Sequence, residues 1–227
     1  SLIETLNAYI KPYRKLRDNK TMIFPEEKPA SPADFMKSYF DQILKCSTSI
    51  DPEKLAEAVN IINNGYKANA TLFSCGNVGS AAISNHLHCD HLKGCQTNTS
   101  LRPKVISLSS NMETITAIAN DISFNDVFLY QLRTMAEPGD ILITISSSGD
   151  SENIVRACNW AKENSVYIIS LTGFDGGRSA KIADISLHVN AKNYGIIEDI
   201  HQSLMHILAQ YIRLNNMNPR LIADTLF

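Results

Sequence analysis

The strongest constraint on the fold is an alternation, from residue 71 onward, between short apolar runs and longer segments with helical periodicity. The runs lack a polar face, which is typical of strands buried on both sides. Helix-length segments between such strands supply the crossovers that parallel strands need. The pattern therefore predicts an α/β fold in which helices cover both faces of a parallel sheet. The expected strands are 71–75, 104–108, 141–145, 166–171 and 185–189, and the expected helices are roughly 80–93, 113–135, 151–163 and 196–213.

The part of the chain before residue 71 predicts helices rather than strands. A short amphipathic helix is expected within 1–18, and prolines among charges mark 19–33 as a linker. Ser31-Pro32 and Asp51-Pro52 each combine a capping side chain with a proline suited to the first turn, so a helix is expected after each pair. The expected units are an N-terminal extension and linker over 1–33, a main domain over 34–216 and a C-terminal tail over 217–227.

The composition excludes several classes of protein. The chain has 227 residues, 44% of them hydrophobic and 19% charged, with a formal net charge of −2. This balance argues against a dedicated nucleic-acid binder or a membrane-surface protein, and no apolar run is long enough to span a membrane. Five scattered cysteines without a CxxC pair imply no disulfide framework. Because no charged and apolar leader indicates secretion, a reducing cytoplasm is the expected compartment.

Small polar residues follow the expected strands at the edge where an open parallel sheet binds its ligands. The loop 76–80, Gly-Asn-Val-Gly-Ser, follows the first strand and leads into a helix, and three consecutive serines, 146–148, follow the third strand. N–H groups at helix N-termini and serine hydroxyls can hold a phosphate without basic side chains. Each loop taken alone is better explained by ordinary caps and turns, but two such loops facing one another favour a phosphate site.

Two common phosphate-binding motifs are absent from the sequence. No GxxxxGK[ST] occurs, which excludes a P-loop nucleotidase, and the loop from Gly76 to Gly79 lacks the GxGxxG spacing of a dinucleotide fold. A small phosphorylated molecule is therefore a better match than a nucleotide, and no nucleotide cofactor is expected.

Histidines and carboxylates form a second set of candidate functional residues. His86 and Asp90 are four residues apart and share one face of their expected helix, and Glu198, Asp199 and His206 belong to the last long helix. Pairs of carboxylate and imidazole suit proton transfer near neutral pH, and the same side chains suit zinc. Surface histidines and charges at a helix start are the plainer interpretation of the same residues.

Several short motifs occur in a fixed order along the chain. They are GNVGSA at 76–81, His86 with an acid four residues later, AND at 119–121, ISSSGDS at 145–151, LTGFDGG at 171–177, ADI at 183–185 and EDIHxxxxH at 198–206. Together they resemble the sugar isomerase (SIS) domain family, and within it the phosphoheptose isomerases and their close relatives. The resemblance covers roughly 35–215.

The resemblance implies a three-layer sandwich around a five-stranded parallel sheet, with N-terminal helices that help build a homotetramer and active sites that lie between subunits. The implied reaction interconverts sedoheptulose 7-phosphate and D-glycero-D-manno-heptose 7-phosphate, or acts on a related sugar phosphate. Such aldose–ketose exchange needs one group to take a proton from the carbon beside the carbonyl and another to protonate the enediolate oxygen. A carboxylate and an imidazole that face one another can do both.

Matched position by position, the resemblance also implies roles for individual residues. Asp90 and His206 take the catalytic positions. In some members a zinc ion lies among four residues that correspond to His86, Asp90, Glu198 and His206. The implied substrate-binding residues are Asn77, Val78, Gly79, Ser80, Asn120, Asp121, Ser146, Ser147, Ser148, Ser151 and Glu198.

The chain departs from the family pattern at three of these positions. Asp90 replaces the usual glutamate and is one methylene shorter, a change that can lower the rate about a hundredfold unless the backbone compensates. Glu198 replaces the usual glutamine and adds a negative charge, which favours a metal or raises a neighbouring pKa. Val78 stands where glycine is usual, and valine is a poor fit if the backbone has a positive φ.

Two other functions remain open at the level of sequence. One is a non-catalytic SIS protein that binds a phosphosugar as a sensor or adaptor, although the retained acid and histidine favour an enzyme. The other is a regulatory protein with a structural zinc at 86–91, near Cys89 and Cys95, whose spacing matches no standard zinc site.

Overall fold

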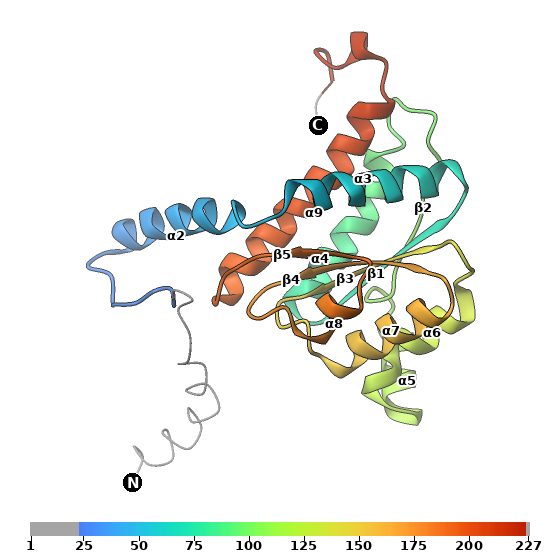
Figure 1. Ribbon diagram of the computed structural model, residues 1–227, viewed down its shortest axis with the longest axis horizontal. Helices are drawn as coiled ribbons and strands as arrows, with labels where there is room; N and C mark the ends of the chain where they lie inside the picture. The colour runs from blue at the N-terminus through green and yellow to red at the C-terminus, as the bar shows by residue number, and fades with distance from the viewer. Residues whose placement is uncertain (1–22, 226–227) are drawn as a thin grey trace.

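A five-stranded, all-parallel sheet forms the centre of the computed structural model, which describes residues 23–225 (Figure 1). The strands are β1 (Thr71–Gly76), β2 (Lys104–Ser107), β3 (Ile141–Ser146), β4 (Tyr167–Thr172) and β5 (Ile185–His188). They lie side by side in the order β2-β1-β3-β4-β5, and each coincides with an expected strand apart from its end residues. The predicted α/β fold with five parallel strands is therefore confirmed. The strand order reverses between β1 and β3, which is where an open sheet of this type binds ligands.

Helices cover both faces of the sheet and complete the three predicted layers. One face carries α3 (Pro52–Lys67), α4 (Gly79–Cys89) and α9 (Tyr194–Asn216), and the other carries α5 (Met112–Asp121), α6 (Val127–Met135), α7 (Glu152–Glu163) and α8 (Gly177–Ile182) (Figure 1). Side chains alternate along β3, so Ile141 and Ile143 join the first core and Leu142 joins the second. A strand used on both faces needs apolar residues at every position, which explains the unbroken apolar runs.

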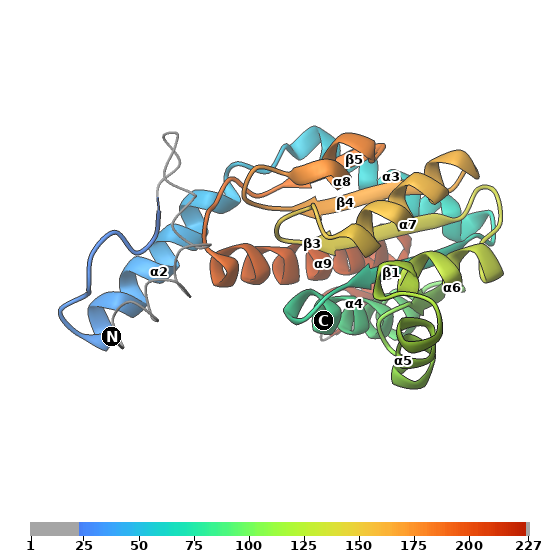
Figure 2. The same cartoon turned by 90° about the horizontal axis from the view of Figure 1, so that it is seen from below.

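α2 (Pro32–Ser47) extends past the edge of the sheet and lies beside the first turns of α9 (Figure 2). The Tyr39 hydroxyl donates a hydrogen bond of 2.8 Å to the carboxylate of Asp199 on α9. Phe24, in the segment expected as a linker, stacks on Phe35 of α2 with ring centroids 5.8 Å apart. The end of this linker is thus packed against α2.

The segment 113–135 is divided, contrary to the expectation of a single helix. α5 ends at Asp121 and α6 begins at Val127. Between them Ser123 accepts a hydrogen bond from the Asn125 N–H and begins a short 3-10 turn. Serine side chains compete in this way with helical backbone hydrogen bonds, which ends a helix that apolar periodicity alone would continue.

The expected helix 80–93 is also shorter, because α4 ends at Cys89 and the chain widens into a π turn over Asp90–Gly94. The Cys95 N–H donates to the Asp90 carbonyl at 3.1 Å, five residues back rather than four.

Two further findings concern the helices in general. The short α8 was not expected, and the helix expected within 1–18 lies outside the described residues. No helix in residues 23–225 combines the length and apolarity needed to cross a membrane.

The loop after β3 is held against the loop after β4 by glycines and by one arginine. Gly149 has a φ of +63°, and a Cβ on it would collide with the carbonyl of Gly176. Arg178 donates to the carboxylates of Asp150 at 2.6 Å and Glu152 at 3.0 Å. These contacts set the path of the backbone that carries the three serines 146–148.

Two buried histidines make the stability of this fold depend on pH. Burial lowers the pKa of His91 and of His201 from 6.5 to about 4. Between pH 6.5 and 4 the unfolded chain therefore binds protons that the folded chain does not. The corresponding stabilisation is fully present above pH 6.5 and is lost as the pH falls toward 4.

We expect the free energy of unfolding, measured by urea titration, to be lower at pH 4.5 than at pH 7.5, and His201→Gln to reduce this difference. At about 1.4 kcal/mol per pKa unit, His201 alone accounts for roughly 2 to 3 kcal/mol of it. An equal pH dependence in the variant and the unaltered chain would show that His201 is not a neutral buried group.

Candidate active site

A cavity of about 500 Å³ lies beyond the carboxyl ends of β1 and β3. The β1–α4 loop, the β3–α7 loop and the first turns of α9 enclose it. Its lining residues are Asn77, Val78, Ser80, Ile145, Ser146, Ser147, Ser148, Ser151, Tyr194 and Glu198. The structure therefore gathers the expected substrate-binding residues in one place, apart from Gly79, which borders the cavity, and Asn120 and Asp121. Tyr194 and Ile145 are additions that the sequence did not indicate.

α4 and α7 both begin at this cavity, and neither has a side chain that caps its first turn. Side chains cap the starts of α2, α3, α5 and α9, whereas α6 and α8, like α4 and α7, lack such a cap. The first N–H groups of α4 and α7 thus remain available to a ligand, together with the positive ends of the two helix dipoles. Paired N-termini of this kind are suited to binding an anion.

Ser147 is the least satisfied donor in the cavity wall. Its side chain is buried, and its Oγ has no hydrogen-bond partner among the described residues. The neighbouring hydroxyls of Ser146 and Ser148 instead accept hydrogen bonds from N–H groups of their own loop. An unpaired buried hydroxyl costs about 1–3 kcal/mol, so a ligand oxygen that accepts from Ser147 Oγ would remove this penalty. No lysine or arginine lines the cavity within residues 23–225.

A reciprocal pair of asparagines joins the starts of α4 and α7. Asn77 Nδ2 donates to Asn153 Oδ1 at 2.9 Å, and Asn153 Nδ2 donates to Asn77 Oδ1 at 3.0 Å. The pair holds the two helix N-termini at a constant separation. Asn153 was not identified from the sequence, although its place in the first turn after Ser151 puts it beside the same loop.

Val78 adopts the backbone conformation that the sequence analysis marked as unsuitable for it. Its φ is +52° and its ψ is −119°, and its side chain is 93% exposed. Valine has a β-branched side chain, and such residues are strained at positive φ. The strain lies in the loop that begins α4, directly at the cavity.

Glu198 reaches the start of α4 because position 79 has no side chain. A Cβ on Gly79 would collide with the Glu198 carboxylate. Burial, and then the charge of Asp199, raises the pKa of Glu198. The Glu198 carboxyl group therefore keeps its proton to a higher pH than an exposed glutamate and, when protonated, can donate a hydrogen bond into the cavity.

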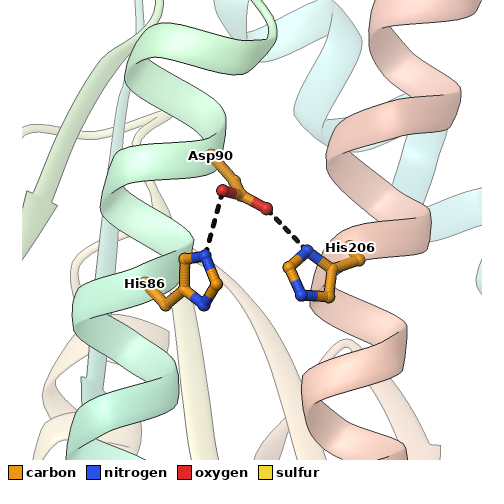
Figure 3. Close-up of side chains that lie close together, drawn as sticks. All are labelled: His86, Asp90 and His206. Carbon is orange, nitrogen blue, oxygen red and sulfur yellow. Dashed lines mark hydrogen bonds and ion pairs between the residues drawn. The ribbon is translucent and has the colours of Figure 1, made fainter. Parts of the chain in front are cut away.

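A second cluster lies where α4 packs against α9. His206 Nδ1 donates to Asp90 Oδ2 at 2.7 Å, and His86 Nε2 lies 3.3 Å from Asp90 Oδ1 (Figure 3). One candidate ligand atom from each of the three side chains lies within 4.8 Å of the others. Two imidazoles and a carboxylate form a donor set that fits zinc.

The π turn that begins at Asp90 is anchored in the core by the next residue. His91 is fully buried, and its Nδ1 lies 2.7 Å from the Tyr66 hydroxyl of α3. This contact holds the backbone beside Asp90 while the Asp90 side chain projects toward α9. Single π turns are frequent at functional sites, where they redirect a side chain that a regular helix would point elsewhere.

Gln202 belongs to the same cluster and was missed by the sequence analysis. Its Nε2 lies 3.0 Å from His86 Nδ1 and 3.0 Å from His206 Nε2. The available signal was its spacing, because Glu198, Gln202 and His206 follow one another at four-residue intervals along one face of α9.

Within a single chain, three expected site residues do not take all of the positions assigned to them. Asn120 and Asp121 are exposed at the end of α5 and do not line the cavity. Glu198 is eight residues before His206, about 12 Å along the helix, and it is not part of the cluster around Asp90.

The cysteines do not support the structural-zinc alternative. Cys95 Sγ donates to the Ala209 carbonyl at 3.3 Å, and Cys89 is exposed. In the part of the chain that the structure describes, the group able to hold a metal consists of His86, Asp90 and His206.

Val78→Gly is expected to raise the free energy of unfolding by roughly 1 kcal/mol, because release of the strain outweighs the added freedom of the unfolded chain. Urea titration of the unaltered chain, Val78→Gly and Val78→Ala measures the effect. Val78→Ala is the control, since alanine keeps a Cβ at positive φ and should not reproduce the gain. Equal stability of the glycine and alanine variants would contradict this interpretation.

Comparison with known proteins agrees with the motifs and the geometry. The SIS domain family model matches residues 37–173. The phosphoheptose isomerase of Shewanella pealeana is 35% identical over 164 residues, which cover 71% of this chain and 83% of the relative. That of Rhodospirillum rubrum is 33% identical over 154 residues, which cover 68% of this chain and 81% of the relative.

A solved structure extends the similarity to three dimensions. The phosphoheptose isomerase of Neisseria gonorrhoeae superposes with a TM-score of 0.73 at 28% identity, covering 80% of this chain and 98% of the other. The sheet, the surrounding helices and most of the chain length are thus shared. On the family model, the sequence identity and the common fold, this chain belongs to the SIS domain family.

Proposed function

We propose that this chain is a phosphosugar aldose–ketose isomerase that interconverts sedoheptulose 7-phosphate and D-glycero-D-manno-heptose 7-phosphate, or a related pair of sugar phosphates. The observation that carries the proposal is the meeting of two uncapped helix N-termini and the unpaired Ser147 hydroxyl in one cavity. The relatives named as phosphoheptose isomerases support the choice of substrate.

In this proposal the phosphate group binds at the starts of α4 and α7. Backbone N–H groups and hydroxyls replace its water molecules, and the two helix dipoles offset its charge in the absence of basic side chains. Asn77 uses one hydrogen and one lone pair of its amide on Asn153, so its remaining capacity is free for a sugar hydroxyl. The hydroxyls assigned to the phosphate are those of Ser80, Ser146, Ser147, Ser148 and Ser151.

Asp90 and His206 are the proposed acid and base. Asp90 takes the proton from the carbon beside the carbonyl and returns it to the neighbouring carbon, which moves the carbonyl by one position. His206 gives a proton to the carbonyl oxygen and takes one from the adjacent hydroxyl. Both side chains end in their original protonation states, so the reaction needs no external oxidant or reductant. The hydrogen bond of 2.7 Å between them orients the Asp90 carboxylate.

His86, Asp90 and His206 are the residues proposed to hold a zinc ion. Their two nitrogen donors and one carboxylate match the usual ligands of a catalytic zinc, which keeps a further position open. A bound zinc would polarise the substrate carbonyl. Glu198 remains the predicted fourth ligand, and within one chain it lies too far along α9 to join the other three.

A homotetramer with active sites between subunits is part of the proposal. The cavity and the Asp90 cluster are separated by about 12 Å along α9, so a second copy would bring one to the other. α2 supports association because Met36, Phe40 and Leu44, spaced four residues apart, are 58%, 62% and 69% exposed. Such an apolar stripe on a projecting helix is typical of a subunit interface. The five free thiols fit the predicted reducing cytoplasm.

Purified protein is expected to isomerise sedoheptulose 7-phosphate, and added zinc is expected to change this activity in a way that a chelator reverses.

Ser147→Ala should raise KM about 10- to 100-fold through loss of one charge-assisted hydrogen bond, with a smaller change in kcat. Ser186→Ala is the matched control, because Ser186 Oγ is also buried and unpaired but does not line the cavity. Asp90→Asn and His206→Asn should lower kcat about 10²- to 10⁴-fold.

Binding of the sugar phosphate without turnover, in a folded protein supplied with zinc, would contradict the enzymatic proposal. That outcome would instead support the alternative of a phosphosugar sensor or adaptor. Equal KM values for Ser147→Ala and Ser186→Ala would contradict the proposed phosphate site.

Mixing two inactive variants tests whether sites are shared between copies. Ser147→Asp places a negative charge in the phosphate site, and His206→Asn removes the proposed acid. When the two are co-expressed in equal amounts, about a quarter of shared sites combine an intact cavity with an intact cluster. Recovery of isomerase activity in the mixture is expected, and a mixture as inactive as its components would show that each site belongs to one chain.

A further inference from the structure

Gln202 occupies the space between the two imidazoles that face Asp90. Its side-chain nitrogen is 3.0 Å from His86 Nδ1 and 3.0 Å from His206 Nε2. Asp90 contacts the opposite nitrogen of each ring, at 3.3 Å from His86 and 2.7 Å from His206. Each imidazole is therefore held at both nitrogens, by the carboxylate on one side and by the amide on the other.

The chemistry of the four groups leaves few arrangements of protons. An ionised carboxylate only accepts hydrogen bonds, so both rings direct an N–H toward Asp90 when no metal is bound. For neutral imidazoles the opposite nitrogens then carry lone pairs. The NH₂ group of Gln202 has two hydrogens and can donate one to each ring. All four contacts are satisfied when His86 carries its proton on Nε2 and His206 on Nδ1.

Because the same terminal atom of Gln202 meets both rings, the two histidines must present the same kind of nitrogen to it. Rotation of the amide by half a turn replaces its NH₂ group with its carbonyl oxygen, which accepts from two N–H groups instead. That second arrangement suits rings whose lone pairs face Asp90, as they must when a cation takes the place of the two ring protons.

We propose that Gln202 is a positioning residue that acts with Asp90 to select the tautomers of His86 and His206, and that its amide rotates by half a turn when a divalent cation binds beside Asp90. Without metal the amide donates to both rings, and with metal it accepts from both. The first half of this proposal is independent of catalysis. The second half rests on the zinc site proposed above, and neither half requires that the substrate be known.

Nuclear magnetic resonance of protein labelled with ¹⁵N in its histidines reads the tautomers directly. At pH 8 without metal, His86 is expected with its proton on Nε2 and His206 with its proton on Nδ1. His206 is the sensitive reporter, because a free imidazole prefers the Nε2–H form. In Gln202→Leu only Asp90 still opposes this preference, so the proportion of His206 in the Nε2–H form should rise. Asn215→Leu, a similar change on an exposed part of α9 further from the cluster, should leave the spectrum unaltered.

Zinc titration of the same samples tests whether the Gln202 amide rotates when a cation binds beside Asp90. Zinc should move the ring protons to His86 Nδ1 and His206 Nε2 in the unaltered chain. Gln202→Leu removes the acceptor for these protons and should weaken zinc binding about 10- to 100-fold in a competition assay, a loss typical of removing a group that orients metal ligands. Gln202→Glu keeps the acceptor and should bind zinc at least as tightly as the unaltered chain.

Several outcomes overturn the proposal. Histidine tautomers that are the same in Gln202→Leu and the unaltered chain would refute the selection of tautomers. A zinc affinity of Gln202→Leu within about twofold of Asn215→Leu would refute the role in metal binding. If the unaltered chain bound no zinc, both the zinc site and the rotation of the Gln202 amide would be refuted. The metal-free spectra would still test whether Gln202 influences the histidine tautomers. None of these measurements uses isomerase activity, so their outcome does not depend on whether the proposed reaction is correct.

Discussion

Parallel strands oblige successive helices to begin at the same edge of the sheet, and the candidate site depends on this constraint. β1 and β3 are neighbours, so α4 and α7 start side by side. Their first N–H groups point to a common space, and no side chain of either helix consumes them. The reciprocal amides of Asn77 and Asn153 hold the two starts together. The cavity is therefore an anion site built mainly from backbone, which explains how it can lack basic residues.

α4 and α9 connect this cavity to the cluster around Asp90. Each helix begins at the cavity, and each carries residues of the cluster further along, Asp90 just after α4 and His206 within α9. Helices have a fixed rise per residue, so their packing sets the separation of the two clusters at about 12 Å. Gln202 occupies the intervening turn of α9 and touches both imidazoles. Its position makes the geometry of the cluster depend on the contact between these two helices.

Departures from the usual family pattern gain a physical meaning in the structure. Val78 is strained at a φ of +52° at the mouth of the cavity, as the sequence analysis anticipated for a positive φ. Glu198 has a raised pKa because it is partly buried beside Gly79 and lies near Asp199. Asp90, although one methylene shorter than glutamate, reaches His206 at 2.7 Å because the π turn lies against α9. The shorter acid thus still contacts its partner.

The sequence by itself determined the α/β class, the five strands and the two polar loops that line the cavity, because these features depend on periodicity and on residues close together in the chain. It was wrong about 113–135 and about the end of 80–93, where a local serine cap and a π turn override a continuous apolar pattern. Only the tertiary structure decided the contacts of Gln202 with His86 and of Asp90 with His206, since each joins residues 116 positions apart. Such pairs are created by the packing of α4 against α9, and no spacing within one segment specifies them.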